Sequence, residues 1–291
     1  MNPTIAFFGT SHISVIVLDE MAKGGVLPSL IITTPAKPKG RGLELAESEV
    51  KKWADERHIP TLEPEKLDSE FIHQLLVTGC DLFIIASYGK IIPRTILDLP
   101  KHGTLNVHPS LLPKLRGASP IQSAILEDAP IGEPHEAGVT IMLIDEEVDY
   151  GPIVAQEKIL VPIWPPKGSE LETILGILGG KLLAETIPQW IQGKITPKEQ
   201  EHTKATYTKK ITKESGRIDL NDDPMRMYRK IRAFDVWPRA YFTTSHKGRT
   251  IRVVVTDAKI KDDKLVPLRV IPEGKREMPY EDFLRGQRNS K

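Results

Sequence analysis

Short apolar runs alternate with helix-like segments over the first two thirds of the chain. Four of these runs are mostly β-branched or aromatic: residues 4–8, 30–33, 82–86 and 104–107. Runs of this length and composition are typical of strands that are buried on both faces of a parallel sheet. Between them, apolar residues fall at helical spacing, most clearly around Trp53 and Phe71. The alternation predicts a doubly wound, mostly parallel α/β sheet with helices on both faces.

Two further helices are indicated by their sequence signals. Ser119 followed by Pro120 favours a helix start, because the N–H that proline lacks is not needed in the first turn. This helix is expected to end near Glu127. Residues 169–192 form a long amphipathic segment, which Pro188 is expected to end or kink.

The pattern changes near residue 193. The stretch 193–206 is polar and has no period, so it is interpreted as a linker. The 291 residues exceed one ordinary compact domain and suit two. We therefore expect a catalytic domain at residues 1–192 and a second domain at residues 207–291.

The predicted second domain combines one helix with alternating strands. Residues 224–233 have helical spacing, and residues 250–256 and 265–271 resemble strands. Turn residues lie between and after the strands, at Asp262-Asp263 and at Glu273-Gly274. Short strands joined by turns predict a small β-barrel.

Composition indicates an ordinary globular protein. The chain is 40% hydrophobic and 27% charged, and its single cysteine, Cys80, excludes an intramolecular disulfide or a cysteine-rich zinc site. The N-terminus has no basic leader and is interpreted as a first strand. No apolar run approaches the ~20 residues that span a bilayer. A cytoplasmic location without a membrane partner is expected.

The net charge of +1 conceals two parts of opposite sign. Residues 1–204 contain 19 Lys and Arg against 27 Asp and Glu, a net charge of −8. Residues 205–291 contain 21 Lys and Arg against 12 Asp and Glu, a net charge of +9. A basic C-terminal third favours a polyanionic partner such as a nucleic acid; the alternative is a basic solvated surface without a ligand.

The run LNVHPSLLPKLRG, residues 105–117, contains the chemistry of interest. Asn106 and His108 lie two positions apart, which on a strand places both side chains on one face. In parallel sheets, ligands bind beyond the carboxyl ends of the strands, where this pair is expected to lie. An amide can donate to a developing oxyanion, and an imidazole can transfer a proton near neutral pH. The pair therefore indicates an acyl-transfer site.

An acidic stretch about forty positions later offers a carboxylate to orient the imidazole and favour its protonated form. Asp149 is one candidate, and its alternative role is that of a turn residue before Gly151. Spacing alone does not separate it from Asp145, Glu146 and Glu147. No metal site is expected, because neither HExxH nor a suitable set of histidines and acids occurs.

The motifs together resemble the 10-formyltetrahydrofolate-dependent formyltransferases. The resemblance rests on NVHPSLLPKLRG, SPIQ and GVTIMLIDEEVDYG, and on TIAFFGT, ITTPAKPKGRG and SYGKIIP nearer the N-terminus. It extends to IRAFDVWPRAYF and EGKREM in the C-terminal third and so covers nearly the whole chain. It implies a Rossmann-like catalytic domain followed by an OB-like barrel that binds tRNA.

The resemblance also implies roles for single residues. Asn106, His108 and Asp149 take the catalytic positions of the family, with no metal and no covalent intermediate. The residues expected to contact 10-formyltetrahydrofolate are Ser110, Leu111, Leu112, Pro113, Tyr88, Ile91 and Ile92.

The C-terminal motifs imply that the acceptor is the α-amino group of methionine carried by initiator tRNA. The expected tRNA contacts are Lys39, Arg41, Lys209 and Lys210, on a protein that is expected to be a monomer. One departure from the family is the acidic stretch 43–47 after Arg41, which should weaken contacts with phosphate.

Two other functions are compatible with parts of the sequence. An N-formyltransferase for nucleotide-linked amino sugars would share the catalytic trio but would not need a strongly basic C-terminal domain. A folate- or RNA-binding protein without catalysis would use the barrel alone. The presence of Asn106, His108 and Asp149 together argues against the second alternative.

Overall fold

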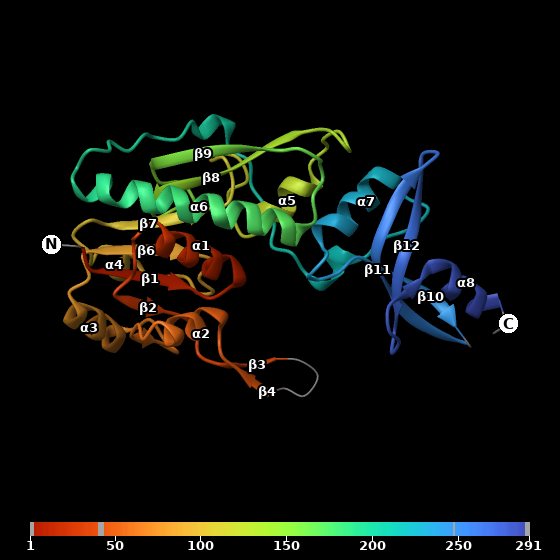
Figure 1. Ribbon diagram of the computed structural model, residues 1–291, viewed down its shortest axis with the longest axis horizontal. Helices are drawn as coiled ribbons and strands as arrows, with labels where there is room; N and C mark the ends of the chain where they lie inside the picture. The colour runs from red at the N-terminus through yellow and green to blue at the C-terminus, as the bar shows by residue number, and fades with distance from the viewer. Residues whose placement is uncertain (1–2, 40–43, 247, 289–291) are drawn as a thin grey trace. The chain divides into compact units, whose positions relative to one another are not determined.

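The computed structural model describes residues 3–39, 44–246 and 248–288 (Figure 1). The chain divides into two compact units. Unit 1 comprises Met1–Arg116, Ala137–Ile159 and Glu172–Tyr207, and unit 2 comprises Gly117–Glu136, Leu160–Leu171 and Thr208–Lys291. Unit 2 thus includes two segments from within the expected catalytic domain. The domain limits at residues 192 and 207 stay a prediction.

A seven-stranded sheet forms the centre of the N-terminal part, in the order β5-β2-β1-β6-β7-β8-β9. Its strands are β1 (Ile5–Gly9), β2 (Leu30–Ile32), β5 (Thr61–Leu62), β6 (Leu82–Ala86), β7 (Thr104–His108), β8 (His135–Leu143) and β9 (Ile153–Val161). The five strands from β5 to β7 are parallel, and β8 pairs with β7 in the antiparallel direction. The four predicted strands and the mostly parallel sheet are confirmed.

Helices cover both faces of this sheet. They are α1 (His12–Lys23), α2 (Glu49–Glu56), α3 (Ser69–Thr78), α4 (Arg94–Leu97) and α6 (Gly168–Ile191). On one face, Phe8 and Ile85 pack against α3 and α4 in one buried cluster. On the other, Val107 of β7 faces α6, since a Cβ added at Gly179 would lie 2.8 Å from its Cγ1. Ser48 and Asp68 are the N-caps of α2 and α3, and the side chain of each accepts a hydrogen bond from a backbone N–H in the first turn.

Helix α6 continues past its proline. Pro188 was expected to end or kink the predicted amphipathic segment, but the helix runs on to Ile191. Proline removes one N–H donor from a helix, and the remaining bonds of the last turn still form. A bond from the N–H of Gln192 to the carbonyl oxygen of Pro188 is an example.

A short hairpin leaves the sheet between β2 and α2. It consists of β3 (Lys37–Lys39) and β4 (Glu44–Ala46), with Lys37 opposite Ala46. The residues that join the two strands, among them Arg41, lie outside the described residues.

Unit 2 contains an antiparallel sheet in the order β10-β11-β12-β13. The strands of this sheet are β10 (Tyr241–His246), β11 (Arg249–Lys261), β12 (Lys264–Pro272) and β13 (Met278–Pro279). Unit 2 also contains the helices α5 (Pro120–Leu126), α7 (Pro224–Ala233) and α8 (Tyr280–Arg288) and the 3₁₀ turn Lys213–Gly216, whereas the 3₁₀ turn His202–Lys204 belongs to unit 1. Val253, Val270 and Met227 lie in the core of unit 2. The strands predicted at residues 250–256 and 265–271 are confirmed, within β11 and β12. Within the described part of the chain the sheet is antiparallel and has four strands, and its closure into an OB-like barrel stays a prediction.

Two predicted features of this unit are found as expected. The helix Pro224–Ala233 has the predicted limits, and Asp223 caps it by accepting the N–H of Arg226. The turn between β11 and β12 places Asp262 and Asp263 at φ of 50° and 53°, the left-handed region that a tight hairpin requires. Among the described residues, no helix is long and apolar enough to cross a membrane.

Candidate active site

Strand β7 presents Asn106 and His108 at its carboxyl end. Asn106 pairs in register with Ile85, so both side chains lie on the sheet face that carries α3 and α4. His108 is two residues further along the same face, as the sequence predicted. Asn106 is half-buried, whereas His108 is buried, with 4% of its surface exposed.

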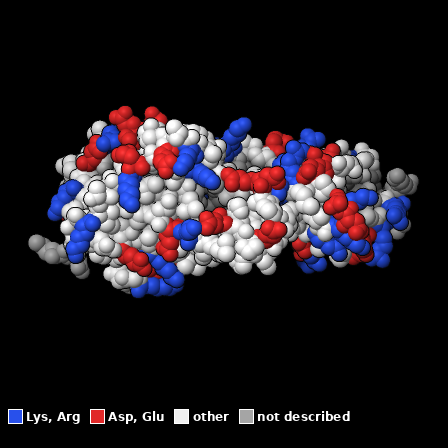
Figure 2. Space-filling view, turned by 90° about the horizontal axis from the view of Figure 1, so that it is seen from above, with Lys and Arg blue, Asp and Glu red and all other residues white. Residues whose placement is uncertain are grey.

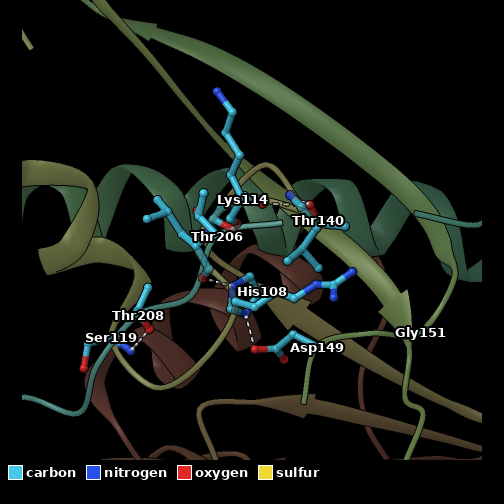
Figure 3. A network of polar contacts seen from close by, with 12 residues as sticks. His108, Lys114, Ser119, Thr140, Asp149, Gly151, Thr206 and Thr208 are labelled. Carbon is cyan, nitrogen blue, oxygen red and sulfur yellow. Dashed lines mark hydrogen bonds and ion pairs between the residues drawn. The ribbon is translucent and has the colours of Figure 1, made fainter. Parts of the chain in front are cut away.

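His108 is held at both ring nitrogens. Its Nδ1 lies 3.6 Å from Oδ2 of Asp149, and its Nε2 lies 3.0 Å from the carbonyl oxygen of Leu115 (Figure 3). A carbonyl oxygen can only accept a hydrogen bond, so Nε2 is the nitrogen that carries hydrogen in this arrangement. The carboxylate thus faces the nitrogen at which the ring can gain or release a proton.

The structure brings one of the four candidate acids to the histidine. Asp149 is that residue, on the loop between β8 and β9, and its φ of 54° lies in the left-handed region. The Asp145 carboxylate instead lies 3.9 Å from the guanidinium of Arg94. Glu146 and Glu147 are exposed. Geometry therefore favours Asp149, the residue that the resemblance implied.

The loop after β7 is fixed by polar contacts. Ser110 donates its hydroxyl to the carbonyl oxygen of Lys114 at 2.7 Å. The Thr140 hydroxyl donates to the carbonyl oxygen of Ser110 at 2.7 Å and accepts from the N–H of Leu112 at 3.1 Å. Ser110 and Leu112 are buried, and Leu111 and Pro113 are half-buried. These side chains hold the loop in place, and their contact with a folate stays a prediction.

The residues after α6 return to this loop, which the sequence did not reveal. The Thr206 hydroxyl accepts the N–H of Leu115 at 2.8 Å, and the Thr206 carbonyl accepts the N–H of Arg116 at 2.9 Å (Figure 3). Leu115 has a φ of 61°, which is strained for a branched side chain. Thr206 therefore helps to hold the strained peptide whose carbonyl binds His108.

Arg116 forms the centre of a second group of missed residues. It is fully buried, and its guanidinium donates to Gln200 and lies 2.9 Å from Nδ1 of His202. The ring of Tyr150 lies 4.7 Å below the guanidinium and stacks on His202 at 3.7 Å. Arg116 belongs to the run LNVHPSLLPKLRG, but its partners Gln200 and His202 lie in the stretch 193–206 that the sequence predicts as a linker. A polar stretch without a period gives no sign that its side chains are buried.

The expected wall of the folate site is partly apolar and exposed. Ile91 is 96% exposed, and Ile92 packs with Tyr88 against the core cluster. The Tyr88 ring packs edge-on against Phe8 at 5.5 Å. Burial raises the pKa of Tyr88 to about 12, and within the described residues its buried hydroxyl has no hydrogen-bond partner.

The expected tRNA contacts are dispersed. Lys39 ends strand β3, Arg41 lies outside the described residues, and Lys209 and Lys210 are exposed in unit 2. On the visible face of the C-terminal part, Lys and Arg are interspersed with Asp and Glu (Figure 2). Among the described residues of unit 2, five arginines are in ion pairs: Arg226, Arg229, Arg232, Arg269 and Arg285. The basic charge is thus distributed over the surface and partly paired.

No group of three or more His, Cys, Asp or Glu residues is arranged to hold a metal ion in the parts of the chain that the structure describes.

The fold and the trio Asn106, His108 and Asp149 define an enzyme of the acyl-transfer type on a doubly wound sheet. Residues 3–173 match the family described as formyl transferase, and residues 210–264 match the formyl transferase C-terminal domain. The chain belongs to the formyl transferase family.

Known proteins resemble the chain over nearly its whole length. The methionyl-tRNA formyltransferase of Thermodesulfovibrio yellowstonii is 36% identical over 306 residues, covering 99% of this chain and 97% of the relative. The structure of methionyl-tRNA formyltransferase from Clostridium thermocellum has a TM-score of 0.60 at 16% identity and covers 95% of this chain and 99% of that one. The structure of HypX from Aquifex aeolicus in complex with tetrahydrofolic acid has a TM-score of 0.66 at 16% identity and covers 98% of this chain and 47% of that one. The two structures show a shared fold.

Proposed function

We propose that this enzyme transfers the formyl group of 10-formyltetrahydrofolate to the α-amino group of methionyl-tRNA, for the initiation of translation. The observation that carries the chemistry is the pairing of His108 with Asp149 at the end of β7, with Asn106 on the same face. The acceptor is supported by a curated methionyl-tRNA formyltransferase that aligns with 99% of the chain.

The three residues divide the work of formyl transfer. When bound, 10-formyltetrahydrofolate supplies an acyl carbon that an amine can attack. The Asn106 amide donates a hydrogen bond to the acyl oxygen, where negative charge develops. His108 moves a proton from the attacking amine toward the leaving nitrogen, and Asp149 orients the imidazole and stabilises its protonated form.

The residues near the site suit a folate. A pterin has a flat ring that can pack on apolar side chains, and the segment 88–92 offers an exposed isoleucine. Ile91 and Ile92 would provide an apolar wall, with Tyr88 packed against the same core cluster as Ile92. The loop from Ser110 to Pro113 would close the site from the side of His108.

The acceptor separates the leading proposal from its rival, an amino-sugar N-formyltransferase. Exposed lysines of unit 2, such as Lys209 and Lys210, are suited to a phosphate backbone. The acidic stretch 43–47 favours the rival, because it follows the loop expected to contact the acceptor stem. The full-length alignment and the matched C-terminal domain outweigh it. A cytoplasmic monomer stays a prediction.

A competition assay tests the acceptor. The purified protein is incubated with radiolabelled 10-formyltetrahydrofolate and equal concentrations of charged initiator tRNA and amino-sugar nucleotides. We expect label on the methionine of the tRNA and none on the sugar. Label that appears only on the sugar would reject the proposed acceptor, and no transfer to either would reject the proposed reaction.

A further inference from the structure

We propose that Gln200 is a positioning residue, which holds the Asp149 loop against His108 through the loop's main chain. The inference rests on the proposed function only for its kinetic consequence. Gln200 lies in the polar stretch that the sequence indicated as a linker, and it is 4% exposed. It therefore acts through its neighbours, without reaching a substrate.

All four hydrogen-bonding positions of the Gln200 amide are used. Its Nε2 donates to the carbonyl oxygens of Asp149 and Gly151, at 2.8 and 2.7 Å. Its Oε1 accepts from Nε and Nη2 of Arg116, at 3.2 and 2.6 Å. Carbonyl oxygens only accept and a guanidinium only donates, so the partners permit one orientation of this amide.

The loop that Gln200 binds requires such support. Asp149 has a φ of 54°, a conformation that non-glycine residues adopt at a cost. Gly151 cannot carry a side chain, because a Cβ there would lie 2.0 Å from the carbonyl oxygen of Leu143. Gln200 binds the main chain on both sides of Tyr150 and thereby fixes the backbone from which the Asp149 carboxylate projects.

Gln200 is itself anchored on two sides. Two residues earlier, Lys198 exchanges both backbone hydrogen bonds with Ile153 of β9, at 2.7 and 2.8 Å. On the other side Arg116 is buried, lies against Tyr150 and His202, and donates its backbone N–H to the carbonyl oxygen of Thr206. Because Gln200 is fixed on both sides, its hydrogen bonds can hold the main chain of the Asp149 loop in one position.

Two substitutions separate the donating half of the amide from the accepting half. Gln200→Met has a similar volume and makes none of the four bonds. Gln200→Glu can still accept from Arg116, but it places a carboxylate oxygen against the carbonyl oxygens of Asp149 and Gly151. Gln189→Met is the matched control, because Gln189 is exposed on α6 and donates only to Glu185 of its own helix among the described residues.

For both Gln200 variants we expect kcat to fall by roughly 10- to 100-fold while the KM for each substrate changes by less than about twofold, since misplacing a catalytic group by about 1 Å has effects of this size. The control should match the wild type. The proposal is overturned if Gln200→Glu retains kcat within about twofold of the wild type. It is equally overturned if both parameters deteriorate together.

A crystal structure of substrate-free Gln200→Glu tests the inference without any assay. The Asp149 carboxylate should be displaced from its 3.6 Å position beside Nδ1 of His108. An unmoved carboxylate would refute the positioning role, even if activity were lost. By contrast, a wild-type enzyme that does not formylate methionyl-tRNA would refute the proposed function and leave this structural result intact.

Discussion

At the scale of single residues, the imidazole of His108 has a different partner at each nitrogen. The Leu115 carbonyl can only accept from Nε2, and Nδ1 faces Asp149. In the proposed mechanism, the ring would therefore exchange a proton at Nδ1, the edge that faces the carboxylate. This geometry depends on the strained Leu115 peptide staying in place.

Replacing Asp149, the acid that faces Nδ1 of His108, should strongly reduce turnover. Asp149→Asn is expected to lower kcat by about 100-fold or more, because the imidazole loses the charge that orients it and stabilises its protonated form. Asp145→Asn is the matched control, since the Asp145 carboxylate lies beside Arg94. Steady-state kinetics of the two variants test the assignment. Equal losses in both would mean that general loop charge, and not one carboxylate, supports the reaction.

The sequence predicted part of this site and could not predict the rest. The shared face of Asn106 and His108 follows from the two-residue period of a strand, which is a local property. The choice of Asp149 depends on the left-handed turn of its loop, and spacing along the chain does not encode which acid such a turn presents. The role of Gln200 is further removed still, because its partners Gly151, Asp149 and Arg116 lie 49, 51 and 84 residues away in the sequence.

At the scale of secondary structure, three glycines let α6 approach its neighbours. A Cβ at Gly176 would meet Ile16 of α1, and one at Gly179 would meet Val107 of β7. The closest approach is at Gly180, where a Cβ would lie 2.6 Å from the backbone oxygen of Val17. The helix behind β7 is thus packed too closely to accept even a methyl group at this point.

Gly180→Ala should reverse the usual effect of this substitution. In a free helix, alanine is favoured over glycine by up to about 1 kcal/mol. At Gly180 we expect a loss of about 1–3 kcal/mol, because α1 and α6 must move apart. Gly286→Ala in α8 is the control, because a Cβ added at Gly286 would meet no described atom within 4 Å. This substitution should leave the free energy of unfolding unchanged or raise it. Urea unfolding followed by circular dichroism measures both, and stabilisation by Gly180→Ala would contradict the packing.

Some elements were beyond the reach of the sequence pattern. Strand β9 contains Gln156, Glu157 and Lys158 in succession, which breaks both the apolar run and the alternation expected of a strand. Its position at the end of the sheet order explains this, because an edge strand can expose charged residues to water. The helix at 224–233, by contrast, has a proline start and a capping aspartate and was predicted to the residue.

At the scale of the whole molecule, the basic C-terminal third does not separate cleanly from the rest. Helix α5, from the middle of the sequence, belongs to the same unit as α7. Arg229 of α7 donates to the carbonyl oxygen of Ala129 at 2.7 Å and pairs with Asp128 at 2.8 Å. Deleting residues 205–291 would remove Arg229 and take this donor away from the carbonyl oxygen of Ala129, so surface charge is better tested by substitution.

The double variant Lys209→Gln, Lys210→Gln should weaken tRNA binding in a salt-dependent way. If both lysines contact phosphates, the slope of log K against log salt should fall by up to about 2, since each contact contributes about 0.7–0.9. Lys181→Gln with Lys194→Gln, in the acidic part of the chain, should leave the slope unchanged. Filter binding over a range of salt concentrations measures it. An unaltered slope in the first variant would place the phosphate contacts elsewhere.

The return of residues 198–207 to the catalytic loop has a consequence for how this protein can be recombined. A chimera joined at residue 193, where the sequence pattern changes, would inherit His108 and Asp149 but take Gln200, His202 and Thr206 from another parent. The foreign segment would have to fit Arg116 and the Leu115 peptide of the host. A junction after Tyr207 keeps His108 in one parent with the residues that hold its loop, Gln200 and Thr206 among them. The C-terminal part proposed to bind the acceptor could then be exchanged without changing the residues proposed for formyl transfer.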